Sequence, residues 1–219
     1  LQNYISEQFE SLGGDKIIIE PKNLGPPGSA TSKNLVLTSK DLDVINDIKG
    51  VNKAEGILFK SGVVSFKNEL NVVYTLGINE GYLELFENFD AFKVIEGKEI
   101  TDNDKFKVVV GYNHAHGDIW EKPVQIRDTI VIEGIEFKVV GIRGKIGNPF
   151  DDNAISIPKE TMREITHVED EESQIIVKTE KGYDPEEVAE EIERKLRDFR
   201  NEREDQETFN VTTSEQLLT

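Results

Sequence analysis

The residues of this chain whose types could do chemistry are three histidines and 43 acidic residues, because the sequence contains no cysteine. The lack of cysteine excludes disulfides, thiolate metal sites and cysteine nucleophiles. His114 and His116 form the only close histidine pair. Residues two apart on a strand share a face, so two imidazoles there could bind one metal ion. A catalytic metal needs a third ligand, for which His167 and Asp118 are the candidates. The ligand count favours solvated histidines over a metal site.

Other motifs of enzymes and cofactor sites are missing from the sequence. The acidic run Glu169-Asp170-Glu171-Glu172 lacks the spaced oxygen ligands and the central glycine of a calcium loop, so a solvated connector is the favoured interpretation. No GxGxxG loop, GxxxxGKS/T loop or GxSxG elbow occurs. No set of residues combines a nucleophile, a base and an orienting group. The sequence therefore predicts no enzyme and no bound cofactor.

Two further features are candidates for recognition. Asn210 begins the sequon Asn210-Val211-Thr212, which is a weak sign of glycosylation outside the cytoplasm. The single tryptophan could form an exposed patch with three phenylalanines, although large aromatic residues are mostly buried and core positions are favoured. These four residues are Trp120, Phe89, Phe92 and Phe150.

The charge of the chain excludes several classes of partner. The 219 residues include 26 basic and 43 acidic side chains, which give a formal net charge of −17. Binding to phosphates requires clusters of lysine and arginine, so neither nucleic acid nor an anionic lipid surface is an expected partner.

The size and hydropathy predict a globular chain. At 37% hydrophobic residues it can bury a core, as one large domain or two small ones. A membrane-spanning helix needs about 20 consecutive apolar residues. No unbroken apolar run here exceeds three residues. The sequence begins with neither a methionine nor a signal peptide, so we expect it to be a segment of a longer protein.

The elements that must position these residues are clearest at the two ends of the chain. An apolar stripe at helical spacing predicts a first helix before Gly13-Gly14. A strand at 17–19, a loop rich in glycine and proline at 21–33 and a helix from Thr38 to Gly50 follow. Near the other end, a strand at 174–178 precedes a helix that starts at Asp184-Pro185, and a strand at 208–212 precedes a helix that starts at Ser214. The first stripe consists of Leu1, Ile5, Phe9 and Leu12, and the stripe of the Asp184 helix consists of Val188, Ile192, Leu196 and Phe199.

The middle of the chain predicts mainly strands. Apolar runs and turn residues give three strands at 51–59, 63–66 and 70–78, with turns at Ser61-Gly62 and Lys67-Asn68. A short helix near 82–86 follows, and another begins at Pro158. Further short strands are predicted at 106–110, 124–126, 129–132, 137–142 and 154–157.

The fold class that these elements predict is α+β. Each end of the chain alone is too small to bury its helix, so we expect both ends to share one sheet. Residues 1–79 and 171–219 then form one discontinuous subdomain, and residues 80–170 form a β-rich insertion.

Several stretches of the sequence resemble the extracytoplasmic core domain of MacB-type permeases, which belong to the wider group of FtsX-like and LolC-like ABC transporters. The most similar stretch is RDTIVIEGIEFKVVGI at residues 127–142, which resembles the family pattern GxxIxIxGxxFxVVGV. Arg127 departs from that pattern, which often has glycine there, and a polar segment at 113–120 replaces a typical Ala/Leu-rich helix. The other matching stretches are GYLELF at 81–86, FKVIEGK at 92–98, VVVG at 108–111, and Asp152 with ISIP at 155–158.

The resemblance implies both a fold and a role. It implies a porter-like subdomain with βαβ units, interrupted by an insertion of the kind called Sabre. It implies a place on the outer face of the cell membrane, between two helices of a permease that forms a homodimer. A separate cytoplasmic ATP-binding subunit or domain would hydrolyse ATP, and the outer domain would relay conformational change to an unknown exported substrate or partner. The predicted helices at 1–12 and 214–218 would be its stiff connections to the membrane.

Two alternatives remain open from the sequence. One is a secreted or envelope binding module of the same fold. The other is a metal-dependent hydrolase that uses His114, His116 and a carboxylate.

Overall fold

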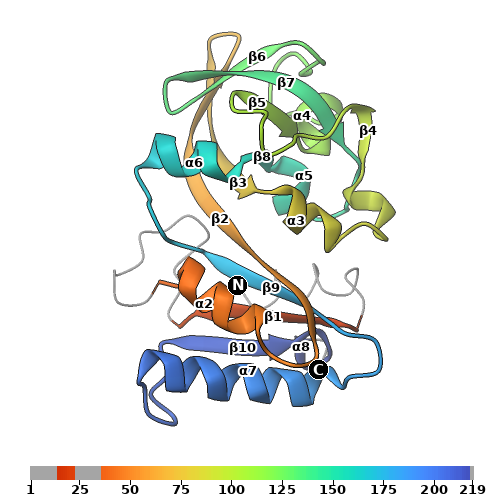
Figure 1. Ribbon diagram of the computed structural model, residues 1–219. Coiled ribbons are helices and arrows are strands. Elements are labelled where there is room, and N and C mark those ends of the chain that lie inside the picture. Colours follow the sequence, from red (N-terminus) through yellow and green to blue (C-terminus); the bar gives the residue numbers. More distant parts are fainter. Residues whose placement is uncertain (1–13, 23–35, 218–219) are drawn as a thin grey trace. The chain divides into compact units, whose positions relative to one another are not determined.

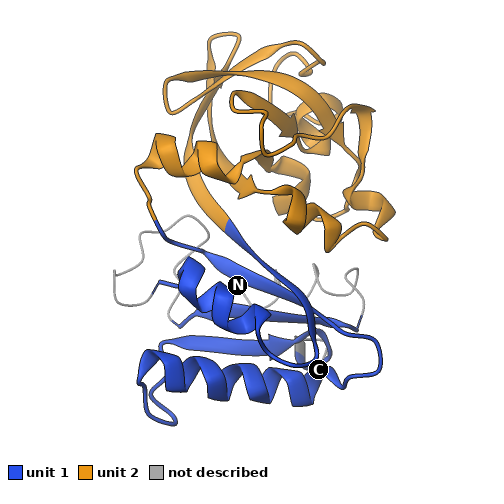
Figure 2. Ribbon diagram, in the orientation of Figure 1, with its two compact units in different colours: residues 1–26, 30–57, 170–219 blue, residues 27–29, 58–169 orange. Residues whose placement is uncertain are grey.

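The computed structural model describes residues 14–22 and 36–217, and these form two compact units (Figures 1 and 2). Of the described residues, unit 1 contains 14–22, 36–57 and 170–217, and unit 2 contains 58–169. None of the helices within the described ranges is long and apolar enough to cross a membrane. The predicted helix at 1–12 and most of the predicted loop at 21–33 lie outside the described residues.

Unit 1 is a four-stranded antiparallel sheet with the strand order β10-β1-β9-β2. Its chain runs β1, α2 and β2, and then, after unit 2, β9, α7 and β10. Each helix therefore crosses between two strands that flank a third, which is the β-α-β-β-α-β arrangement of ferredoxin-like folds. The elements are β1 (Lys16–Pro21), α2 (Ser39–Asn46), β2 (Val51–Phe66), β9 (Gln174–Thr179), α7 (Pro185–Arg200), β10 (Phe209–Thr213) and α8 (Ser214–Leu217).

The two main helices of unit 1 begin where the sequence predicts and cover one face of the sheet. Thr38 and Asp41 form a reciprocal capping box at the start of α2, and the carboxylate of Asp184 caps α7. Val188, Ile192 and Leu196 of α7 pack on alternate residues of the strands. Phe199, the fourth residue of the predicted stripe, is half-exposed and does not join this core. The Arg200 guanidinium at the end of α7 donates to the buried Asp41 carboxylate at 2.9 Å, which ties the two helices together.

Unit 2 contains a closed barrel of six strands, because the pairing β2-β3-β8-β5-β7-β6 returns to β2. β3 lies parallel to β8 and β5 lies parallel to β7, while the other four pairs are antiparallel. The strands are β3 (Glu69–Ile78), β4 (Val94–Gly97), β5 (Lys107–Val110), β6 (Thr129–Ile132), β7 (Ile135–Arg143) and β8 (Ile155–Pro158); β4 pairs with β7 beside the barrel. The helices are α3 (Glu80–Glu84), η1 (Asp90–Phe92), α4 (Tyr112–His116), α5 (Pro149–Asn153) and α6 (Lys159–Thr166).

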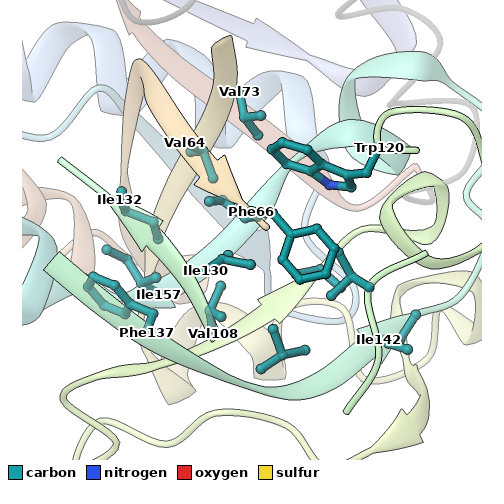
Figure 3. Packing of buried hydrophobic residues seen from close by; sticks show 14 of the residues in the cluster. Val64, Phe66, Val73, Val108, Trp120, Ile130, Ile132, Phe137, Ile142 and Ile157 are labelled. Atoms are coloured by element: carbon teal, nitrogen blue, oxygen red, sulfur yellow. The ribbon is translucent and has the colours of Figure 1, made fainter. Parts of the chain in front are cut away.

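The side chains that point into the barrel form the core of unit 2 (Figure 3). Phe66, Phe137 and Val108 are almost fully buried there, and the Trp120 ring meets the Phe66 ring edge-on at 5.7 Å between centroids. A barrel of this size is filled by its own side chains rather than being hollow. The inward residues of β2, Val64 and Phe66, alternate with outward ones along the strand.

Two of the predicted local features are wrong. Ser61 and Gly62 do not turn, because they pair with Tyr74 and Val73 of β3, and β2 runs unbroken to Phe66. Lys67 and Asn68, both with positive φ, form the turn instead, as predicted. Residues 124–126 are not a strand, because hydrogen bonds to the carbonyl oxygen of His114 and to the Asp128 carboxylate hold them in a loop.

The α+β class is confirmed, but the contacts divide the chain at a different place from the predicted boundary at 79/80. The division lies between residues 57 and 58 because the β2–β3 hairpin supplies two adjacent strands of the barrel and directs Val64, Phe66 and Val73 into its core. The second division lies at 169/170, one residue from the predicted one. The porter-like and Sabre-like character of the two parts stays a prediction.

Candidate functional site

An exposed apolar surface lies on the side of the β2–β3 hairpin that points away from the barrel core. Val63 faces Val72 across the two strands, and Ser65 faces Leu70. The exposed fractions of Val63, Leu70 and Val72 are 52%, 70% and 74%. These are three of the six large hydrophobic residues that are exposed among the described residues. We call the surface formed by Ser61, Val63, Ser65, Leu70 and Val72 the hairpin outer face.

Aromatic side chains border the hairpin outer face toward the base of the hairpin. The Phe150 ring from α5 lies 4.8 Å from the ring of Tyr74 and 6.1 Å from the ring of Phe59, measured between centroids. Phe59 and Tyr74 belong to the same side of the hairpin as Val63 and Val72, because strand side chains alternate. All three rings are half-buried. Apolar surface therefore continues from the base of the hairpin toward its exposed tip.

The histidine pair lies on a helix rather than on a strand. His114 and His116 belong to α4, where residues two apart point to nearly opposite sides. Both ring nitrogens of His114 already have hydrogen-bond partners: Nε2 lies 2.8 Å from the Asn153 carbonyl oxygen, and Nδ1 accepts from Trp120 Nε1 at 2.9 Å. His116 is exposed, with Nε2 3.6 Å from a Glu96 carboxylate oxygen.

The other proposed metal ligands do not join this pair. His167 is exposed at the end of α6, in the left-handed conformation. In residues 14–22 and 36–217 no three side chains of histidine, aspartate or glutamate come together as a metal site would require. The geometry of His114 thus suits a structural histidine that holds Trp120 and α5 in place.

Burial lowers the pKa of His114 to about 4, although the hydrogen bond to Asn153 opposes this shift. The unfolded chain, with the ordinary histidine pKa near 6.5, then binds more protons between these two values. We expect the free energy of unfolding of unit 2 to fall as the pH drops below 6.5, by roughly 3 kcal/mol from this residue at pH 4. Urea unfolding at a series of pH values, followed by the fluorescence of Trp120, measures this fall in the free energy of unfolding. The same pH series on His114→Gln isolates this contribution, and equal pH slopes in the two proteins would contradict it.

The remaining candidates divide between surface and interior. In the acidic run, Asp170 is exposed and accepts a hydrogen bond from the Ser39 backbone at 2.8 Å, as a solvated connector allows. Glu172 contradicts that interpretation, because it is 1% exposed and its backbone pairs with Leu37. Asn210 is exposed on β10 opposite Glu20, and its glycosylation stays a prediction.

The aromatic residues do not gather into one exposed patch. Trp120 is a core residue, as favoured, and Phe150 packs beside the hairpin. Phe92 is half-buried, and the Arg143 guanidinium lies 4.3 Å from its ring centroid. Arg143 is itself buried and pairs with Glu99 at 3.0 Å, a contact that nothing in the sequence indicated.

The departures from the resembled pattern have structural explanations. Arg127 has a φ of 77°, in the left-handed region that favours the glycine of that pattern. The polar segment at 113–120 still begins as a short helix, α4. Its Asn113 and His114 side chains both bond to Asn153, so its polar residues fasten α4 to α5.

Sequence reasoning missed the hairpin outer face, although a signal for it was present. Val63-Val64 and Val72-Val73 each put apolar residues on both sides of a strand. Such pairs indicate a strand with two apolar faces, whereas a half-buried strand alternates apolar and polar residues.

The polypeptide enters and leaves the sheet of unit 1 at neighbouring strands. β1 and β10 are antiparallel, with Ile17 opposite Thr213, so the start of β1 lies beside the end of β10. α8 continues directly from Thr213 and contacts both strands. The start of β1 and the end of β10 are therefore joined by hydrogen bonds between the two strands.

Comparison with known proteins adds a family and a fold. The model of the MacB-like periplasmic core domain matches residues 1–195. An uncharacterised ABC transporter permease of Methanocaldococcus jannaschii is 32% identical over 219 residues, and the chain spans about half (52%) of its length.

Two solved structures are similar in fold. The periplasmic region of MacB from Actinobacillus actinomycetemcomitans matches 95% of this chain and 93% of its own, at a TM-score of 0.72 and 15% identity. The extracellular domain of the noncanonic ABC-type transporter YknZ from Gram-positive bacteria matches 90% of this chain and 100% of its own, at a TM-score of 0.66 and 18% identity.

Proposed function

The chain belongs to the family of MacB-like periplasmic core domains, the extracytoplasmic domains of ABC transporter permeases, and from this membership we propose that it relays movement of membrane helices to a substrate or partner outside the membrane. ATP hydrolysis belongs to a separate cytoplasmic subunit or domain in this proposal. The permease works as a homodimer, and this chain contributes no catalytic residue.

The observation that best supports the relay is the adjacency of β1 and β10. A shift between the two membrane helices reaches the domain through the start of β1 and the end of α8, which lie together at one end of the sheet. Backbone hydrogen bonds join β1 to β10 and to β9, so the sheet resists being pulled apart. Packed and hydrogen-bonded elements of this kind move as rigid bodies when their connections are displaced.

A flexible insertion tests the relay in the full permease, reconstituted with its ATPase. A Gly/Ser insertion after Gly14 lengthens the connection to β1, so we expect severalfold weaker export while ATP hydrolysis continues. The matched control is the same insertion after Glu204, in the exposed loop between α7 and β10. Equal export by the two variants, at the rate of the unmodified permease, would refute the relay through β1.

A further inference from the structure

The strand β10 passes into the helix α8 without any linking residue (Figure 1). Thr213 is the last residue of β10, and Ser214 is the first residue of α8. Both residues are 1% exposed. Conformational changes in proteins are usually absorbed by a few residues in loops or at the ends of elements. Because strand and helix are contiguous here, the stiffness of the junction depends on how these two buried residues are held.

A reciprocal pair of hydrogen bonds holds the junction. The hydroxyl oxygen of Thr213 accepts from the backbone N–H of Gln216 at 3.2 Å. In return, the backbone N–H of Thr213 donates to Oε1 of Gln216, also at 3.2 Å. This is a capping box, in which the residue before a helix and the third residue of the helix bond to each other. The box ties the first turn of α8 to the last residue of β10.

Gln216 also satisfies a backbone group that the sheet leaves over. The N–H of Lys22 donates to the carbonyl oxygen of Thr208 at 2.8 Å, so every second residue of β10 up to Thr212 faces β1 with its backbone groups. The N–H of Thr213 therefore points away from β1. A buried N–H without a partner is costly, and the Gln216 side chain provides the partner. Losing this side chain would weaken the end of the strand and the start of the helix together.

We infer that Gln216 is a positioning residue of the relay, whose capping box makes the junction of β10 and α8 a rigid joint. A segment attached after α8 then displaces β10 instead of turning about the junction. Ile17 of β1 lies opposite Thr213, so a displacement of the joint reaches both strands. This inference rests on the proposed relay and deepens it, because it assigns the stiffness of one connection to one side chain.

The test uses the full permease, a homodimer in our proposal, together with its ATPase. Asn210→Cys carries a spin label at an exposed site on β10, and pulsed electron resonance measures how far ATP shifts the distance between the labels of the two copies. Loss of a cap raises the population with a frayed first turn about fivefold, so we expect Gln216→Ala to reduce this shift at least about twofold. ATP hydrolysis should continue at the unmodified rate. Alanine favours helix, so this substitution removes only the cap.

Two further variants separate the joint from a general loss of stability. Gln216→Glu keeps a side-chain acceptor that completes a capping box, so it should restore the shift. Thr38→Val breaks the capping box that Thr38 forms with Asp41 at the start of α2, in the same unit. Loss of that box costs a comparable amount of stability, but α2 leads only from one strand of the sheet to another. Thr38→Val should therefore leave the ATP-dependent shift unchanged.

Four results would overturn the inference. Gln216→Ala shifts with ATP as far as the unmodified permease, which would leave the relay in place without this joint. Gln216→Glu behaves like Gln216→Ala, which would mean that the capping box is not the cause. Thr38→Val reduces the shift as much as Gln216→Ala, which would show that any weakening of unit 1 has this effect. The labelled permease without these substitutions hydrolyses ATP and shows no shift, which would contradict the relay itself and the joint with it.

Discussion

Phe137→Ala is expected to lower the free energy of unfolding of unit 2 by about 3–5 kcal/mol, the largest effect of any single substitution considered for this chain. Phe137 is 0% exposed, near the start of β7, and its ring points into the barrel that six strands close around it. Removing the ring leaves a cavity that a hydrogen-bonded barrel cannot close by collapsing.

The single tryptophan makes this measurement selective. Trp120 lies in the same core, so its fluorescence during urea unfolding reports unit 2 alone. Phe199→Ala is the matched control, because it removes the same ring from a half-exposed position on α7 in unit 1. The control should leave the Trp120 transition in place within about 0.5 kcal/mol. If Phe137→Ala shifted that transition no more than Phe199→Ala does, the closed barrel would be wrong.

Gly111→Ala is expected to destabilise unit 2 by about 3 kcal/mol, at the upper end of the usual cost of overpacking. A Cβ on Gly111 would lie 2.5 to 2.7 Å from the carbonyl oxygens of Asp151, Asp152 and Ala154. These are backbone atoms of α5 and its end, which cannot rotate away as a side chain can. The φ of Gly111 is −67°, which alanine adopts freely, so the entire cost is steric.

A second glycine provides the control for Gly111→Ala. Gly134 lies in the turn between β6 and β7, with φ of 79° and nothing within 4 Å of an added Cβ. Gly134→Asn should cost far less, because asparagine tolerates that backbone conformation. Urea unfolding followed by Trp120 compares the two variants. Equal stability of Gly111→Ala and the unmodified chain would mean that α5 does not approach Gly111 this closely.

The elements that could be predicted from the sequence are those whose signals are local. Thr38, Asp41 and Asp184 mark helix starts through side chains within one turn, so α2 and α7 begin where predicted. The strands of unit 1 and most of the barrel were found from short apolar runs. The stretch at 127–142 pointed to the family because its turns and inward residues lie close together in the sequence.

The features that could not be predicted depend on contacts between residues far apart in the sequence. β2 continues through Ser61 and Gly62 only because β3 pairs with both residues, and this pairing overrides their turn preference. The barrel closes through Val64 opposite Ile132, a pair that no local pattern indicates. The boundary between the two units follows from that closure, so it lies at 57/58 and not at the 79/80 that the order of the predicted elements indicated.

The candidate site was harder to predict than the fold. The His114–Trp120 contact joins a helix to a loop, and no spacing rule predicts that both ring nitrogens of His114 are satisfied. Val63 and Val72 differ from Val64 and Val73 only in which side of the hairpin they occupy. Which side of the hairpin faces the core becomes clear only once the barrel is known to be closed.

Spin labels provide the most direct test of the relay. The chain has no cysteine, so Asn210→Cys places one label in this domain, at an exposed site on β10. In the full permease, a homodimer in our proposal, the distance between the two labels is measured by pulsed electron resonance with and without ATP, in the presence of the ATPase. We predict that ATP shifts the distance distribution, and that the insertion after Gly14 reduces the shift. An unchanged distribution in a permease that hydrolyses ATP and exports its substrate would contradict the relay.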